Sequence, residues 1–314
     1  MTTPNRRLRS TVLLALSGSL LATASLAAGT TAPSTSPETH AGRASVYQSL
    51  QEGSLEQVTS PDHIQAVTHG NVAPMEIWRA LEHGERVECL SCIPSVSKLL
   101  YDGNRKTREI SAWWLRRRIF GVFGPGQVYP QTIETLRSDV SPERRAYAAE
   151  ALGEFLTAAG IPEVARAAVS DASPLVRVSA VRALERLNNQ GPAAELATAI
   201  ADAAPEVRLA ALSAVVRVHV FTRLDAVVAR LGDDDARVRR LAAMALGTLR
   251  SADAVVGLVA LTDPAREKDA GVRGAAVAAL GSIGDPNGRD AVLAAATDPD
   301  PLVQSAARIA LRRL

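Results

Sequence analysis

The chain has 314 residues, which is enough for one long domain or two of ordinary size. Apolar residues make up 47% of the chain but aromatic residues only 4%, so alanine, leucine and valine supply its hydrophobic surface, as is typical of closely packed helices. The 35 lysines and arginines nearly balance the 33 aspartates and glutamates, which excludes the basic excess of a protein that binds nucleic acid through its overall charge.

The N-terminus has the features of an export signal. Three arginines within the first nine residues precede an apolar run, and small residues suited to cleavage follow it. Glycine and serine interrupt a run already shorter than the roughly 20 residues that span a membrane. We therefore expect a signal peptide over residues 1–28, with no membrane span after its cleavage. The mature protein is then periplasmic or secreted, and its 32 basic and 33 acidic residues give a net charge of −1.

Two segments precede the main domain. Residues 29–45 are rich in threonine, serine and proline and lack an apolar period, which predicts a disordered tether. Residues 46–86 show helical patterning. Within this N-terminal helical segment, Pro74 near the start and Gly84 past the end mark one helix.

The only two cysteines of the chain, Cys89 and Cys92, form a C-x-x-C motif. Ile93 follows where a c-type haem motif requires histidine, which excludes covalent haem attachment. Three interpretations remain open. The pair is a local structural disulfide, or it is redox-active because a helix N-terminus lowers a thiol pKa, or it joins His69 and His83 in a Cys₂His₂ metal site of unusual spacing.

From residue 102 onward the sequence repeats itself, with steps of 31 to 37 residues. Aligned copies include "SDASPLVRVSAVRALERL" (170–187) and "ADAAPEVRLAALSAVVRV" (201–218). The aligned column holds Arg108, Arg145, Arg177, Arg208, Arg239, Arg273 and Gln304. A small residue stands three positions later and leucine or valine seven positions later, so both lie on one helical face. Each copy is a helical hairpin that buries its apolar face only by stacking on its neighbours.

The pattern D-x-x-x-x-V-R-x-x-A-x-x-A-L resembles the short HEAT-like repeats of the type also found in phycobilin (PBS) lyases. The resemblance covers roughly residues 88–314 and implies an exported bacterial member of that family. It implies an all-α fold, a right-handed α-solenoid of about seven stacked helical hairpins over residues 87–314. It says little about function, because this scaffold serves many roles.

Acidic residues recur six positions before the arginine column. We expect them to pair with arginines as a structural ladder at the turns rather than to bind metal. The ladder residues are Asp102, Arg108, Asp139, Arg145, Asp171, Arg177, Asp202, Arg208, Asp233, Arg239 and Arg273.

The first repeat departs from the others. Trp114 replaces an alanine and is expected in the core, where it plugs the end of the array or meets the N-terminal segment. Trp113, Arg116 and Phe120 share the opposite face, which in a HEAT-like solenoid usually lines the concave side. Aromatic and arginine side chains together are typical of binding sites.

The step after the first repeat is longer and contains the turn-rich loop "FGVFGPGQVYP" (120–130) with Phe123 and Tyr129. Long loops on repeat scaffolds often carry function, so we expect a protein-binding site at this end. In a second interpretation, residues 46–86 fold back over the face formed by Trp113, Arg116 and Phe120. If the site lies elsewhere, the mildly apolar positions Val178, Leu209 and Val216 are the next candidates.

No catalytic triad, nucleotide loop or paired-carboxylate motif is present in the sequence. The leading hypothesis is an exported, non-catalytic scaffold that binds another protein, with no cofactor and no nucleic acid. The alternative is an accessory factor in redox or cofactor (haem or metal) handling that uses the Cys89/Cys92 pair, as a thiol–disulfide oxidoreductase or a lyase-like protein.

Overall fold

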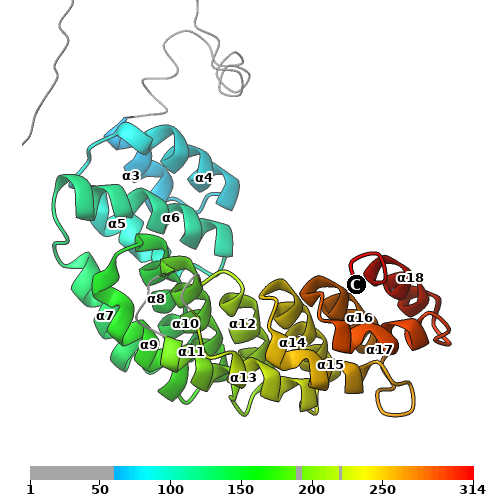
Figure 1. The fold of residues 1–314 in the computed structure, drawn as a ribbon. Helices are drawn as coiled ribbons and strands as arrows, with labels where there is room; N and C mark the ends of the chain where they lie inside the picture. Colours follow the sequence, from blue (N-terminus) through cyan, green and yellow to red (C-terminus); the bar gives the residue numbers. More distant parts are fainter. Residues whose placement is uncertain (1–59, 189–192, 219–220) are drawn as a thin grey trace, which may run out of the picture. The chain divides into compact units, whose positions relative to one another are not determined.

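The computed structural model describes residues 60–188, 193–218 and 221–314. The expected signal peptide, the tether and the first part of the segment 46–86 lie outside these residues, so their boundaries stay predictions. Within the described residues the chain is all-α, and its helices pack in pairs as a HEAT-like α-solenoid (Figure 1), which confirms the expected fold class.

The sixteen α-helices of the described residues form eight consecutive hairpins, each with a first and a second helix. They are α3 (Pro61–His69) with α4 (Pro74–His83), α5 (Ile93–Lys98) with α6 (Arg105–Arg117), α7 (Val128–Ser138) with α8 (Pro142–Phe155), α9 (Ile161–Ser170) with α10 (Pro174–Leu187), α11 (Ala193–Ile200) with α12 (Pro205–Val215), α13 (Leu224–Ala229) with α14 (Ala236–Thr248), α15 (Val255–Leu261) with α16 (Ala270–Ile283), and α17 (Arg289–Ala295) with α18 (Pro301–Ala310).

Five of the eight second helices of the described residues, α6, α8, α14, α16 and α18, begin after a residue whose side chain caps them. Ser141 Oγ accepts a hydrogen bond from the backbone N–H of Arg144, and Asp300 accepts one from Leu302. In both cases proline follows the cap, at a position where its missing N–H costs no hydrogen bond. Seven residues past the arginine column, apolar side chains such as Leu152 and Leu246 are fully buried.

An arginine of each repeat links two turns. Arg177 Nη1 donates to the carbonyl oxygen of Asp171 in its own repeat at 2.8 Å. Its Nε and Nη2 donate to the two carboxylate oxygens of Asp202 in the next repeat at 2.7 and 2.8 Å. The same carboxylate accepts the N–H of Ala204, which holds the next turn in place. We call this arrangement the arginine–carboxylate ladder.

The ladder joins six successive repeats through five inter-repeat pairs. The inter-repeat pairs are Arg145–Asp171, Arg177–Asp202, Arg208–Asp233, Arg239–Glu267 and Arg273–Asp298. Only 6% of the Arg273 side chain and 1% of the Asp298 side chain are exposed, so solvent screens this pair weakly. The hydrogen bonds from Arg273 lower the pKa of Asp298, although burial opposes the shift.

The first repeat departs from this pairing. Arg108 donates to the carbonyl of Asp102 but binds Glu150 on α8, with Nη2 2.9 Å from the carboxylate. The Tyr147 ring lies 3.8 Å from its guanidinium. The carboxylate of Asp139, the next acidic residue of the predicted ladder, binds Arg144 at 2.8 Å. The acidic partner of Arg108 therefore comes from a helix rather than from a turn.

A glycine eight positions past the ladder residue sets how closely second helices approach. At Gly153, Gly247 and Gly281, an added Cβ would lie 2.9, 2.7 and 2.6 Å from the Cα of an alanine in the next repeat. The three helix pairs concerned, α8/α10, α14/α16 and α16/α18, pack more extensively than α6/α8, α10/α12 and α12/α14. The latter pairs have Arg116, Glu185 and Val216 at this position.

Gly247→Ala is therefore expected to lower the free energy of unfolding by about 1–3 kcal/mol, because the new methyl group meets Ala279 backbone atoms that cannot move aside. Gly274→Ala is the matched control in a second helix. Its Cβ would meet only Val303 at 3.9 Å, so helix propensity should raise stability by about 0.5–1 kcal/mol. Urea denaturation checks both, and equal effects of the two substitutions would show that this close approach does not constrain the fold.

Candidate functional site

A buried tryptophan and arginine join the first hairpin to the rest of the solenoid. Trp114 is fully buried, and its Nε1 donates to the carbonyl of Gly84 at 3.0 Å. Arg118 is 1% exposed and stacks on the Trp114 ring at 3.7 Å. It also donates to the carbonyl oxygens of Gly84, Glu85 and Val87. Burial, followed by the charge of Arg117, lowers the Arg118 pKa to about 10. The expected core position of Trp114, against the N-terminal segment, is confirmed.

Arg118 was not among the predicted site residues, although its position in the repeat marks it as unusual. Ten positions past the ladder residue, every later repeat has an apolar residue: Phe155, Leu187, Val218, Leu249, Ile283 and Leu314. An arginine in a core column indicates a specific partner, which here is the turn of residues 84–87.

The residues expected to form one binding stripe differ in their exposure and contacts. Trp113 is partly buried and packs against the core, and Arg116 donates from Nη1 to the carbonyl of Glu154 at 3.4 Å. Phe120 remains 41% exposed, with its ring against those of Tyr129 and Phe155. A role for Trp113 and Arg116 in binding stays a prediction.

Tyr129 is not a surface residue, contrary to the expectation. It lies in the first turn of α7, is 7% exposed and packs between Phe155 and Gly160. Burial raises its pKa to about 12. The sequence-based interpretation extended the loop through Tyr129, whereas the helix already begins at Val128.

The long loop borders an apolar groove. After α6 the chain makes one π-helical turn, η3 (Arg118–Val122), and then uses Gly124 and Gly126 at positive φ to reach α7. A groove of about 950 Å³ lies between α5, the 3₁₀ turn η2 (Leu99–Tyr101) and α7. Its apolar lining includes Leu90, Ile93, Leu100, Tyr101, Phe123 and Val128. We call this the α5–α7 groove.

Large apolar side chains at the groove are open to solvent. Leu90 is 63% exposed and Phe123 is 38% exposed. The hydroxyl groups of Ser97 and Thr132 donate to carbonyl oxygens of their own helices. At the other end, Arg144 lies over the Tyr101 ring and pairs with Asp139. The groove therefore combines apolar surface with polar side chains such as Lys98, Gln127 and Gln131, which suits a peptide segment with apolar side chains.

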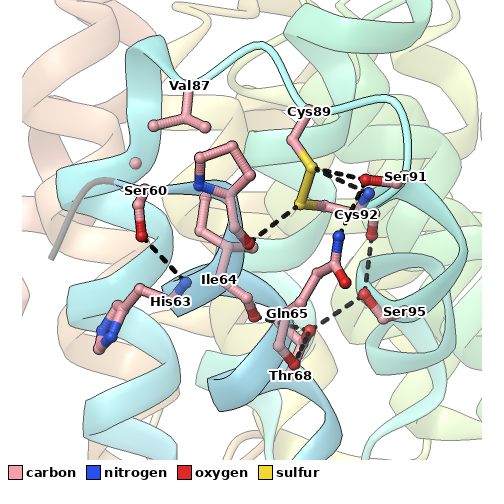
Figure 2. Close-up of a disulfide and its surroundings, with 12 residues drawn as sticks. Ser60, His63, Ile64, Gln65, Thr68, Val87, Cys89, Ser91, Cys92 and Ser95 are labelled. Carbon is pink, nitrogen blue, oxygen red and sulfur yellow. Dashed lines mark hydrogen bonds between the residues drawn. A yellow bond between two sulfur atoms is a disulfide. The ribbon is translucent and has the colours of Figure 1, made fainter. Parts of the chain in front are cut away.

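Cys89 and Cys92 form a disulfide directly before α5 (Figure 2). The two cysteines are 4% and 0% exposed, and Cys92 Sγ lies 3.6 Å from the carbonyl oxygen of Pro61 in α3. Around them, Gln65 and Thr68 of α3 donate to Ser91 and Ser95. The disulfide thus lies where α3 packs on α5 and the residues directly before it (Figure 2). Both hydrogen bonds and apolar side chains contribute to this contact.

This burial bears on the two chemical interpretations of the motif. Thiol–disulfide exchange needs access to a sulfur atom, and α3 covers both. Metal binding needs thiolates, whereas these sulfurs are bonded to each other. Among the residues that the structure describes, no three His, Cys, Asp or Glu side chains are grouped to hold a metal ion, so His69 and His83 do not complete a ligand set with the cysteines.

The comparison with protein families identifies the class of this protein. A family model described as HEAT repeats matches residues 129–216 and 223–312, more than half of the chain. The chain therefore belongs to the HEAT-repeat family. A comparison with curated proteins gives no match.

Solved structures share the fold at low sequence identity. The Escherichia coli protein YibA is 17% identical with a TM-score of 0.52, over 89% of this chain and 100% of that one. Kap95p is 14% identical with a TM-score of 0.62, over 81% of this chain and 40% of that one. Kap121p bound to Nup53p is 15% identical with a TM-score of 0.52, over 81% of this chain and 33% of that one. These similarities show the fold alone.

The helices of the described part of the chain do not combine the length and apolar character that crossing a bilayer requires.

If the disulfide is structural, a small dithiol should reduce it at least about 100-fold more slowly in the native protein than in urea, because α3 must first open. Alkylation followed by mass spectrometry measures both rates. Equal rates in the two conditions would show that the sulfurs are accessible in the native protein and would restore the redox interpretation.

Proposed function

We propose that this protein is an exported, non-catalytic HEAT-repeat scaffold, periplasmic or secreted, that binds another protein through the α5–α7 groove. The observation that carries this proposal is the exposure of Leu90 and Phe123 at the edge of a groove with an apolar lining. Large apolar side chains at a concave surface are typical of protein-binding sites.

The local fold supports this function. The ladder and the packed second helices make the later repeats a regular scaffold, and the groove lies where the chain departs from that pattern. Loops carried on a regular scaffold frequently supply binding residues. Kap121p, which has the same fold, is described as bound to Nup53p. Protein binding is also the role typical of HEAT-repeat scaffolds.

The alternative, an accessory factor in redox or cofactor handling, rests on the Cys89/Cys92 pair. Burial of both sulfur atoms gives that alternative no accessible reactive group in the native protein. We therefore place the function in the groove and assign the disulfide to fixing the turn directly before α5, beside the groove residue Ile93.

Leu90→Asp combined with Phe123→Asp should weaken capture of the partner at least about tenfold, because carboxylates replace the apolar contacts of the groove. Both side chains are exposed, so thermal unfolding should stay close to wild type. Affinity capture from the native envelope or culture medium, quantified by mass spectrometry, measures the effect on each captured protein.

Val256→Asp is the matched control, since Val256 is 83% exposed on α15, away from the groove. It should leave capture unchanged. If the groove variant retains every partner that wild type captures, binding does not use this groove. Trp113, Arg116 and the positions Val178, Leu209 and Val216 then become the surfaces to test.

A further inference from the structure

Basic residues outnumber acidic residues on the second helices of the last three hairpins. The segments of α14, α16 and α18 contain arginines but neither aspartate nor glutamate. Some of these arginines are neutralised by residues in the turns. Arg237 pairs with Asp235, Arg239 with Glu267 and Arg273 with Asp298.

Other arginines of these repeats have no such partner. Arg240, Arg250, Arg312 and Arg313 are all exposed. Within the described part of the chain, no carboxylate lies within the 4.0 Å of an ion pair from any of them. Two of the four, Arg250 and Arg313, follow the ends of α14 and α18, where the helix dipole supplies about half a negative charge at most. A net positive surface remains.

Arg250 and Arg313 line one hollow. A cavity of about 630 Å³ lies where α14, α16 and α18 end, and its other lining residues include Gly247, Gly281 and Gly284. The helices lie side by side there, as Figure 1 shows in yellow to red. Because glycine carries no side chain, backbone and guanidinium groups together border this hollow.

Apolar side chains also stand on the outward side of these second helices. Met244, Ala278 and Ile309 stand five positions past the ladder residue of their repeats, so they occupy equivalent outward positions on α14, α16 and α18. Met244 is 49% exposed and Ile309 is 56% exposed, whereas Ala278 between them is small. Ala278 thus presents a small side chain between two larger apolar side chains.

We infer that this basic face, formed by Arg240, Met244, Arg250, Ile309, Arg312 and Arg313, binds an acidic segment of a partner protein that also carries apolar side chains. Carboxylates of the segment pair with Arg250 and Arg313 at the hollow. Its apolar side chains cover Met244 and Ile309, and its backbone lies over Ala278. Arginine suits this task because its planar guanidinium binds carboxylates in two-point contacts.

The composition of the face favours an acidic protein segment over other polyanions. No aromatic side chain belongs to it, so the bases of a single-stranded nucleic acid would find no stacking partner. The basic face is separate from the α5–α7 groove, and the inference does not depend on the function proposed for that groove.

Fluorescence anisotropy with a labelled short peptide of glutamate, leucine and glycine tests the inference. The full chain should bind this peptide, should not bind the counterpart with glutamine in place of glutamate, and should lose affinity as salt is raised. Arg250→Glu with Arg313→Glu should weaken binding at least about tenfold. Met244→Ser with Ile309→Ser should also weaken it, whereas Val256→Ser should not.

Arg79→Glu with Arg289→Glu is the matched control, because it changes the net charge equally at two exposed arginines on α4 and α17. This control and Leu90→Asp with Phe123→Asp should retain peptide binding. Equal binding of the glutamine peptide, or equal loss in the control, would overturn the inference. So would binding of phosphatidylglycerol vesicles that depends on Arg250 and Arg313 without binding of the peptide, since the face would then serve a membrane surface.

Discussion

The arginine–carboxylate ladder is the interaction on which the rest of this solenoid depends. Apolar stacking drives the hairpins together, but it is not directional and would tolerate sliding between them. A two-point hydrogen bond such as Arg177–Asp202 is directional, and the same arginine also holds the turn of its own repeat. Each carboxylate in turn accepts a backbone N–H of the turn in which it lies. One side chain per repeat therefore fixes both the turn and the register of the next hairpin.

Because residues at a few repeated positions stabilise the stack, the residues at other positions are free to differ. The two proposed binding surfaces are formed by such residues. At the N-terminal end, Arg118 binds the turn that follows the first hairpin and the disulfide fixes the turn before α5, while the loop before α7 borders the α5–α7 groove. At the C-terminal repeats, Gly247 and Gly281 bring second helices close together, and the unpaired arginines lie at their ends. Departures from a sufficient structural pattern are where function is expected.

The repeat pattern predicted the hairpins well, since the arginine column, the small residue and the leucine recur at spacings that only a stacked helical pair explains. The repeat pattern also predicted that Trp114, which replaces an alanine, lies in the core. Other features depended on three-dimensional context. Whether Tyr129 belongs to the loop or to α7 follows from where the helix starts, and the partner of Arg108 is Glu150 on a helix, outside the acidic column of the repeats. Glu267 was not predicted as a ladder residue, because glutamate replaces aspartate six positions before the arginine of its repeat. The groove could not be predicted, because it arises from the space between two helices rather than from any motif.

A double-mutant cycle on Arg177→Met and Asp202→Asn, followed by urea denaturation, tests the central role of the ladder most directly. Each single substitution leaves a partly buried group without its partner and should cost about 3–5 kcal/mol. The double variant should lose less than the sum of the two, with a coupling energy of about 1.5–3 kcal/mol. Losses that simply add would contradict this account, because they would show that the two side chains stabilise the solenoid independently and that apolar packing alone fixes the register of the repeats.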